Sequence, residues 1–150
     1  MTRVVGSIPP HGGQLVNRVL RGGLREAALE RATAFPKVRL TRMAASDLEM
    51  IGVGAFSPLN GFMTKADYDS VIDNMRLESG LPWTIPVTLP VDDDTPAGLA
   101  EGQEVALLHG DHLMGIMTIA EKYSVDRERE AREVYRTTEE AHPGVARLYR

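Results

Sequence analysis

The 150-residue sequence contains no cysteine. This absence excludes a disulfide framework, a thiolate zinc site and a cysteine nucleophile, and it is typical of a protein in the reducing cytoplasm, where we expect this one. Long apolar runs are also missing, since none approaches the ~20 residues needed to cross a bilayer. Residues 1–7 lack the apolar region of a signal peptide. We therefore expect no membrane partner.

The overall composition is that of a folded protein. Hydrophobic residues make up 43% of the chain and charged residues 25%, far from the composition of disordered sequences. A chain of this length fits one domain and buries roughly 68–70% of the surface that its unfolded form exposes. We therefore expect residues 1–150 to form a single domain.

Charge is distributed unevenly along the chain. Residues 1–42 contain eight Lys/Arg and two Asp/Glu, a net charge of +6. Residues 43–150 contain nine Lys/Arg and nineteen Asp/Glu, a net charge of −10. A basic segment of this kind could contact polyphosphate, nucleic acid or an acidic neighbouring surface. The alternative is a solvated face, or ion pairs with the acidic remainder.

Helical signals occur in the first half of the chain. Apolar residues at helical spacings predict a helix over residues 24–35, which Pro36 ends. Ser46-x-x-Glu49 is a capping box and predicts a short helix that begins at Asp47 and ends near Gly52 or Gly54. A weaker capping box, Thr64-x-x-Asp67, precedes a helix with one apolar face. That face contains Tyr68, Val71, Ile72 and Met75.

A further helix is predicted near the end of the chain. Asp126 can cap it, and Ala131, Val134, Tyr135 and Thr138 would share its apolar face. The charged residues within 127–133, Glu130 among them, would then form a solvated face. Residues 141–145 contain a Pro-Gly pair and should break this helix.

Strand signals occupy other segments. Residues 37–42 alternate between polar and apolar side chains, and residues 84–91 predict an edge or bulged strand because Pro86 and Pro90 cannot donate to a ladder. Residues 92–98 predict a charged turn. Residues 104–109 and 112–123 predict a hairpin around a type II′ turn at Gly110-Asp111. Together these elements indicate an α+β domain with a small, curled, mostly antiparallel sheet.

Two glycine pairs could be taken for phosphate-binding loops. Gly12-Gly13 and Gly52-x-Gly54 lack the strand-to-helix context and the Lys-Ser/Thr that such loops require. We expect these glycines to provide unusual backbone angles, with Phe56 nearby pinning the loop to the core.

Several motifs together resemble one family. They are Asp47-Leu-Glu-Met-Ile-Gly-Val-Gly-Ala-Phe-Ser-Pro-Leu-Asn-Gly-Phe-Met63, Pro10-His11-Gly12-Gly13-x-Leu15-Val16-Asn17, the segment from Met75 to Leu89, Glu121-Lys122-Tyr123, and Ala141-His142-Pro143-Gly144-Val145. With these motifs the chain resembles the N-terminal domain of ATP sulfurylases (sulfate adenylyltransferases), from about Gly6 to Arg150. The resemblance implies a PUA-like pseudo-β-barrel with short peripheral helices. It also implies that a separate catalytic nucleotide-binding domain would follow residue 150 and is absent from this chain.

The family transfers the adenylyl group of ATP to sulfate and releases pyrophosphate. The resemblance implies Mg-ATP as the cofactor of the parent enzyme, held with sulfate by a Q-x-R-N-P segment and an H-x-x-H segment of the catalytic domain. The first is missing, since Gln14 and Gln103 are followed by other residues. His109-Gly-Asp-His112 spells the second, but these histidines flank a hairpin turn and lack a third zinc ligand. We therefore predict no catalytic, cofactor-binding or metal-binding residue in this chain and no activity of the chain alone.

The last residues are the predicted contact with the missing catalytic domain. We expect Val145, Leu148 and Tyr149 to form an exposed apolar patch where the family's chain leaves this domain. The full set of predicted contact residues is His142, Pro143, Gly144, Leu148 and Tyr149.

Other functions are weighed against this one. The alternative is a free-standing PUA-like module that binds RNA or protein, because PUA-like folds often bind RNA and the basic segment would supply the electrostatic attraction. The negative overall charge and the lack of aromatic residues among the basic ones argue against it, so we expect no nucleic acid. A self-sufficient enzyme would need clustered acid, base or phosphate-holding residues that the sequence does not offer. The expected partners are thus the catalytic domain and, in a homo-oligomer, further copies.

Overall fold

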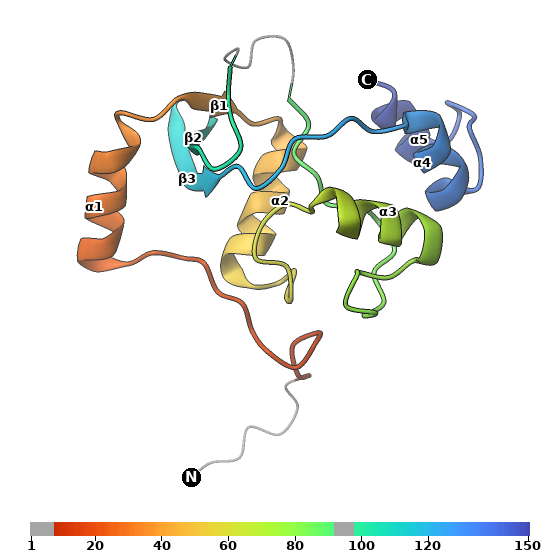
Figure 1. Cartoon of the computed structure of the whole chain (residues 1–150), viewed down its shortest axis with the longest axis horizontal. Coiled ribbons are helices and arrows are strands. Elements are labelled where there is room, and N and C mark those ends of the chain that lie inside the picture. The colour runs from red at the N-terminus through yellow and green to blue at the C-terminus, as the bar shows by residue number, and fades with distance from the viewer. Residues whose placement is uncertain (1–7, 92–97) are drawn as a thin grey trace. The chain divides into compact units, whose positions relative to one another are not determined.

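The computed structural model describes residues 8–91 and 98–150, and Figure 1 shows the elements. The charged turn predicted at residues 92–98 therefore lies, apart from its last residue, outside the described residues. The described residues form two compact units: unit 1 comprises residues up to 62 together with 89–119, and unit 2 comprises residues 63–88 together with 120–150. The elements are α1 (Gly22–Ala32), β1 (Lys37–Arg39), α2 (Arg42–Val53), α3 (Lys65–Asn74), β2 (Glu104–His109), β3 (His112–Thr118), α4 (Arg127–Glu130), the π-helix η1 (Ala131–Tyr135) and α5 (Pro143–Leu148).

Unit 1 is built on a three-stranded sheet in the order β1-β2-β3. β2 pairs with β3 in antiparallel fashion, while β1 pairs with β2 in parallel. The predicted α+β class is confirmed, but one of the two pairings departs from the mostly antiparallel sheet that we expected. The long connection between β1 and β2 allows this parallel pairing. The core of the unit contains Val38, Leu40, Ala44, Ala45, Val105, Leu107 and Ile119.

The predicted hairpin is confirmed at its turn. Gly110 has a φ of 58°, and Asp111 is not among the described residues with positive φ, which is the pattern of a type II′ turn. The ladder pairs His109 with His112 and contains an irregularity between Leu107 and Leu108. β3 ends at Thr118, earlier than the predicted end at residue 123.

α2 begins five residues before the predicted start. Thr41 is its N-cap, and the Thr41 hydroxyl accepts a hydrogen bond from the backbone N–H of Ala44 at 3.2 Å. Ser46 therefore lies inside the helix, and the predicted capping box there is wrong. Because Thr41 follows β1 so closely, the predicted strand over residues 37–42 is shortened to Lys37–Arg39. The predicted helix end is confirmed at Gly54, which has a φ of 83°.

α1 confirms the predicted helix, although it ends at Ala32 and not at residue 35. Ala32 is the one buried residue of this helix, and Leu24 is 71% exposed. Arg31 anchors the C-terminal end of α1 to the start of β2 through two hydrogen bonds to the Glu104 carboxylate, of 2.6 and 2.7 Å.

Unit 2 is organised around α3. Tyr68, Val71 and Ile72 are buried as predicted, whereas Met75 leaves the helix as a left-handed C-cap with a φ of 53°. The strand predicted over residues 84–91 is not formed in the structure. Two of its residues are prolines, which cannot donate ladder hydrogen bonds, and this accounts for the difference.

The C-terminal part of unit 2 contains three short helices. The Asp126 carboxylate caps α4 by accepting from the backbone N–H of Arg129 at 2.9 Å, as predicted. α4 continues into η1, which ends at Arg136 with a φ of 59°. The helix therefore ends before Thr138, which is exposed, and the break predicted at residues 141–145 is misplaced, because α5, which the sequence did not indicate, begins at Pro143. Within the described residues, no helix has the length and apolar character that crossing a membrane requires.

Candidate functional site

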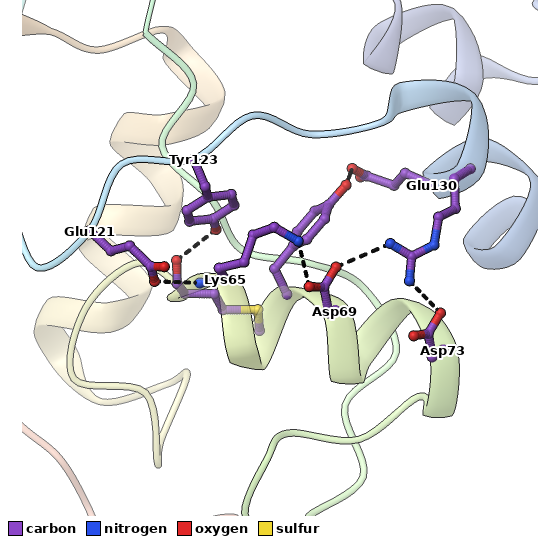
Figure 2. A network of polar contacts seen from close by, with 9 residues as sticks. Lys65, Asp69, Asp73, Glu121, Tyr123 and Glu130 are labelled. Atoms are coloured by element: carbon purple, nitrogen blue, oxygen red, sulfur yellow. Dashed lines mark hydrogen bonds and ion pairs between the residues drawn. The ribbon is translucent and has the colours of Figure 1, made fainter.

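A network of polar contacts lies in unit 2, where α3 faces the segment of residues 121–130 (Figure 2). We call it the α3 network. Its members are Met63, Lys65, Tyr68, Asp69, Asp73, Glu121, Tyr123, Arg129 and Glu130.

Arg129 connects α4 to α3. One of its terminal nitrogens lies 3.1 Å from Asp69 Oδ1 and the other 2.6 Å from Asp73 Oδ1. The two aspartates are four residues apart and thus lie on one face of α3. Asp69 also accepts a hydrogen bond from Lys65 Nζ, and this bond is the main reason why the pKa of Asp69 lies below its usual value, with Arg129 contributing.

Glu130 is buried beside α3, although we had predicted it to lie on a solvated face. Its side chain accepts a hydrogen bond of 2.8 Å from the hydroxyl of Tyr68, and the residue is only 9% exposed. Burial raises the pKa of the Glu130 carboxyl, and the bond from Tyr68 opposes that shift. The sequence offered no sign of this pair, because 62 residues separate its members and Glu130 stands in a run of alternating charges.

Tyr123 packs against the same region. Its hydroxyl donates to the backbone carbonyl of Met63 at 2.8 Å, and its ring centre lies 5.7 Å from that of Tyr68. Burial, foremost, raises the pKa of Tyr123 to about 12. Burial is also the main cause that raises the pKa of Tyr68, and the neighbouring Glu130 raises it further. Both phenols are therefore protonated hydrogen-bond donors at neutral pH.

The start of α3 is capped from a distant part of the chain. The Glu121 carboxylate accepts a hydrogen bond of 2.9 Å from the backbone N–H of Lys65, while Thr64 makes no side-chain cap. Asp67, the other half of the predicted capping box, accepts instead from the backbone N–H of Glu78 at 2.8 Å. The predicted capping box between Thr64 and Asp67 is therefore wrong, because the carboxylate of Glu121, 56 residues from Lys65, accepts the hydrogen bond at the start of α3.

The α3 network pairs its own charges. Asp69 and Asp73 face Arg129 and Lys65, the Glu130 carboxylate has the Tyr68 hydroxyl, and no buried side-chain polar atom among the described residues lacks a hydrogen-bond partner. In residues 8–91 and 98–150, no group of three or more histidine or acidic side chains is placed to hold a metal ion. The chemistry that this arrangement supports best is the fastening of α3 to the segment that leads into α4.

The two histidines of His109-x-x-His112 lie at the hairpin turn, as the sequence indicated. His109 ends β2 and pairs with His112 at the start of β3. The Nδ1 atom of His109 lies 3.3 Å from the carbonyl oxygen of Leu40, and Arg39 donates to the carbonyl of Gly110 at 3.3 Å. Both contacts link the turn to the segment that contains β1.

The structure gives the predicted contact residues at the C-terminal end local roles. His142 is the N-cap of α5: its Nδ1 accepts a hydrogen bond of 3.2 Å from the backbone N–H of Gly144, and its ring centre lies 5.1 Å from that of Tyr135. Pro143 occupies the first helical position. Leu148 and Tyr149 are half-buried.

Val145 departs from the predicted exposed apolar patch. It is fully buried within unit 2, because α5 turns this residue inward against η1. The contact of His142, Pro143, Gly144, Leu148 and Tyr149 with another domain stays a prediction.

Gly12, Gly13 and Gly54 adopt the unusual backbone angles that we expected, whereas Gly52 lies inside α2 without a positive φ, so the expectation is wrong for that residue. Gly12, Gly13 and Gly54 have φ angles of 77°, 84° and 83°. A Cβ atom on Gly54 would lie 2.7 Å from Cδ1 of Leu15 and 2.9 Å from the carbonyl oxygen of Val16. Gly54 therefore allows residues 15–16 to approach the end of α2 closely.

The chain matches a known family over almost its full length. A family model described as a PUA-like domain matches residues 8–150. A sulfate adenylyltransferase of Symbiobacterium thermophilum is 56% identical over 144 residues, which are 95% of this chain and 37% of that protein. A sulfate adenylyltransferase of Synechococcus sp. (strain JA-3-3Ab) is 48% identical over 150 residues, which are 99% of this chain and 38% of that protein. The chain thus spans under two fifths of the length of these relatives.

Two further proteins are also similar to the chain. A probable bifunctional SAT/APS kinase 2 of Sorangium cellulosum is 48% identical over 95% of this chain and 25% of its own length. Among solved structures, the hexameric APS kinase from Thiobacillus denitrificans matches with a TM-score of 0.71 and 34% identity, over 79% of this chain and 24% of that one.

Proposed function

Because the chain belongs to the PUA-like domain family and corresponds to the N-terminal part of sulfate adenylyltransferases, we propose that it is the non-catalytic N-terminal domain of such an enzyme. The parent enzyme would convert ATP and sulfate to adenylyl sulfate and pyrophosphate. This domain would support the folding and assembly of the enzyme, in the cytoplasm, and the remaining part would bind Mg-ATP and sulfate.

The observation that carries this proposal is that the match covers nearly all of this chain but only part of each relative. Relatives named sulfate adenylyltransferase match 95–99% of this chain, yet the match accounts for only 37–38% of their own length. The α3 network supports a structural role, because Asp69 and Asp73 are already paired with Lys65 and Arg129, and the Glu121 and Glu130 carboxylates accept hydrogen bonds within the network. His109 and His112 pair with each other across the hairpin turn, and the His109 ring contacts the carbonyl oxygen of Leu40, which is a structural position.

We propose in addition that β1–β3 form part of a PUA-like pseudo-β-barrel with short peripheral helices. The family match supports this finer fold. The irregularity between Leu107 and Leu108 supports it too, because a bulge bends a strand in the way that a curled sheet requires.

The partners that we propose are the catalytic part of the enzyme and further copies of the chain. His142, Pro143, Gly144, Leu148 and Tyr149 would contact the catalytic part. The half-burial of Leu148 and Tyr149 leaves apolar surface for that contact. Assembly into a homo-oligomer is supported by the similarity to a solved protein described as hexameric.

A chimera tests the proposed function. This chain would replace the matching segment of the Symbiobacterium thermophilum relative, and adenylyl sulfate formation would be measured with a coupled assay. We expect an active chimera and an inactive isolated chain. Val105→Asp, which places a charge at a fully buried position of unit 1, should abolish activity of the chimera by unfolding the domain.

The histidines of the hairpin provide the counter-test. The chimera with both His109→Ala and His112→Ala should keep its turnover. Turnover by the isolated chain that disappears in either histidine variant would overturn the proposal and make this hairpin catalytic.

A further inference from the structure

The dipeptide Asn60-Gly61 has no part in the proposed function. The chain contains three asparagines, Asn17, Asn60 and Asn74, and only Asn60 is followed by glycine. Asn60 is exposed and Gly61 is half-buried, and both lie outside any helix or strand in the segment that joins α2 to α3 (Figure 1). Water therefore has access to this pair.

An asparagine side chain can react with the backbone that follows it. The attacking atom is the backbone nitrogen of the next residue, and a hydrogen bond from that nitrogen must be broken before it can attack. The next residue must also leave room for the ring that forms. Glycine does so, because it has no Cβ atom and reaches backbone angles that other residues avoid.

The backbone hydrogen bonds distinguish the three asparagines. The N–H that follows Asn17 donates to the carbonyl oxygen of Gly52 at 2.8 Å. The N–H that follows Asn74 donates to the carbonyl oxygen of Val71 at 2.9 Å. The N–H of Gly61, in contrast, donates to no residue that the structure describes. Only at Asn60 are a following glycine and a free backbone nitrogen combined.

We propose that Asn60 is a site of spontaneous deamidation. The Gly61 nitrogen loses its proton to solvent and attacks Cγ of Asn60, and the bond from Cγ to Nδ2 breaks as Nδ2 takes up a proton and leaves as ammonia. Water then opens the resulting succinimide ring at either of its carbonyl carbons. The product is aspartate or isoaspartate at position 60. Nothing is oxidised or reduced, and water is the only co-reactant.

The isoaspartate product lengthens the backbone. Its chain runs through the side-chain carbon, which adds one carbon atom between positions 60 and 61. Leu59 is buried, with its N–H bonded to the carbonyl of Phe56 at 2.8 Å, and Phe62 packs against the core of unit 1. Because both flanking residues are held in close-packed surroundings, a longer turn should destabilise unit 1. The aspartate product only adds an exposed negative charge.

Peptide mapping of the 150-residue chain measures the three rates together. Trypsin places the asparagines on separate peptides, residues 4–18, 43–65 and 66–76. After incubation at 37 °C and pH 8, we expect Asn60 to deamidate at least about tenfold faster than Asn17 and Asn74. The rate at Asn60 should fall at pH 6, because the attacking nitrogen must lose its proton. Similar rates at all three asparagines, or a faster rate at either of the others, would overturn the inference.

Gly61→Ala is the matched variant. A Cβ atom at position 61 would meet nothing within 4 Å, and Gly61 has no positive φ, so circular dichroism and the melting temperature should stay unchanged. We expect this variant to slow deamidation at Asn60 severalfold and to leave the rates at Asn17 and Asn74 as they were. An unchanged rate at Asn60 in the folded variant would refute the role of Gly61.

Deamidation in urea tests the role of the hydrogen bonds. Unfolding frees the N–H groups that follow Asn17 and Asn74, so these two sites should deamidate faster in the unfolded chain than in the folded one. Asn60 should change least, because the folded chain already leaves the N–H of Gly61 free. A rise at Asn60 that exceeds the rises at the other two would mean that the fold protects this site, and the inference would be wrong.

Melting temperatures test the effect on unit 1. Ion exchange separates the deamidated chains, and enzymatic methylation of the isoaspartyl carboxyl group identifies the isoaspartate form. We expect that form to melt several degrees below the fresh chain. Asn60→Asp, which adds the charge without the extra backbone carbon, should melt within about one degree of it. Equal melting temperatures for the isoaspartate form and Asn60→Asp would overturn the destabilising effect of the longer turn.

Discussion

The hydroxyl of Tyr68 donates a 2.8 Å hydrogen bond to the buried carboxylate of Glu130, and this bond joins α3 to the end of α4. Tyr68→Phe removes the donor and leaves a desolvated carboxylate without it. We expect a loss of about 1–3 kcal/mol in the free energy of unfolding at pH 7, measured by urea denaturation. Tyr123→Phe is the matched control, because its hydroxyl donates to a neutral backbone carbonyl, and its smaller cost should not change with pH.

Glu130 makes the stability of the chain depend on pH in a defined direction. Burial raises its pKa in the folded state above the ordinary 4.5, so the folded state binds more protons than the unfolded state between the two values. Stability therefore falls as pH rises through that interval. We expect Glu130→Gln to gain stability relative to the parent between pH 4 and pH 7. A difference that stays constant over this range would contradict the assignment.

Arg129 should contribute more than the other surface arginines of its segment. It bridges Asp69 and Asp73 on another helix, whereas Arg132 pairs only with Glu128 four residues before it. We expect Arg129→Ala to cost about 1–2 kcal/mol and Arg132→Ala less than about 0.5 kcal/mol, both measured by chemical denaturation. The Arg129 effect should shrink in 0.5 M NaCl, because the side chains involved are partly exposed. Equal losses for the two variants would refute the bridging role.

Alanine substitutions at Gly54 and Gly80 distinguish the cost of a strained backbone angle from the cost of a steric clash. Both have positive φ, of 83° and 86°, but a Cβ on Gly80 meets nothing within 4 Å, whereas one on Gly54 meets residues 15–16. We expect Gly80→Ala to cost about 1 kcal/mol and Gly54→Ala about 2–4 kcal/mol. The melting temperature of each variant measures this. Similar losses would show that residues 15–16 can move aside freely.

The C-terminal residues should matter more in the longer protein than in the isolated chain. Leu148→Ala and Tyr149→Ala remove half-buried apolar groups, whose predicted partner is the catalytic part of the enzyme. We expect each to lower the melting temperature of the chimera by several degrees more than that of the isolated chain. Thr138→Ala is the control, since Thr138 is exposed and lies outside the predicted contact residues, so this variant should leave both melting temperatures unchanged. An equal effect in both proteins would assign these side chains to unit 2 alone.

Local patterns in the sequence predicted the elements that short-range chemistry controls. The alternation of polar and apolar residues predicted β1, the Gly110-Asp111 dipeptide predicted the hairpin turn, and Asp126 predicted the start of α4. The motifs also identified the family, which the comparisons confirm. Each of these features depends on residues that lie within a few positions of one another, so the chain itself carries the information.

Tertiary contacts decided the rest. The pattern at Thr64 predicts a local capping box, yet the carboxylate of Glu121, 56 residues away, accepts the hydrogen bond from the backbone N–H of Lys65 in the first turn of α3. Glu130 appears in a charged run, but its burial follows from Tyr68, 62 residues away. The sequence by itself determined the family, the hairpin turn and the presence of α1, α3 and α4, but not α5. Only the tertiary structure decided which polar groups are removed from water, since that depends on contacts between distant segments that no local pattern encodes.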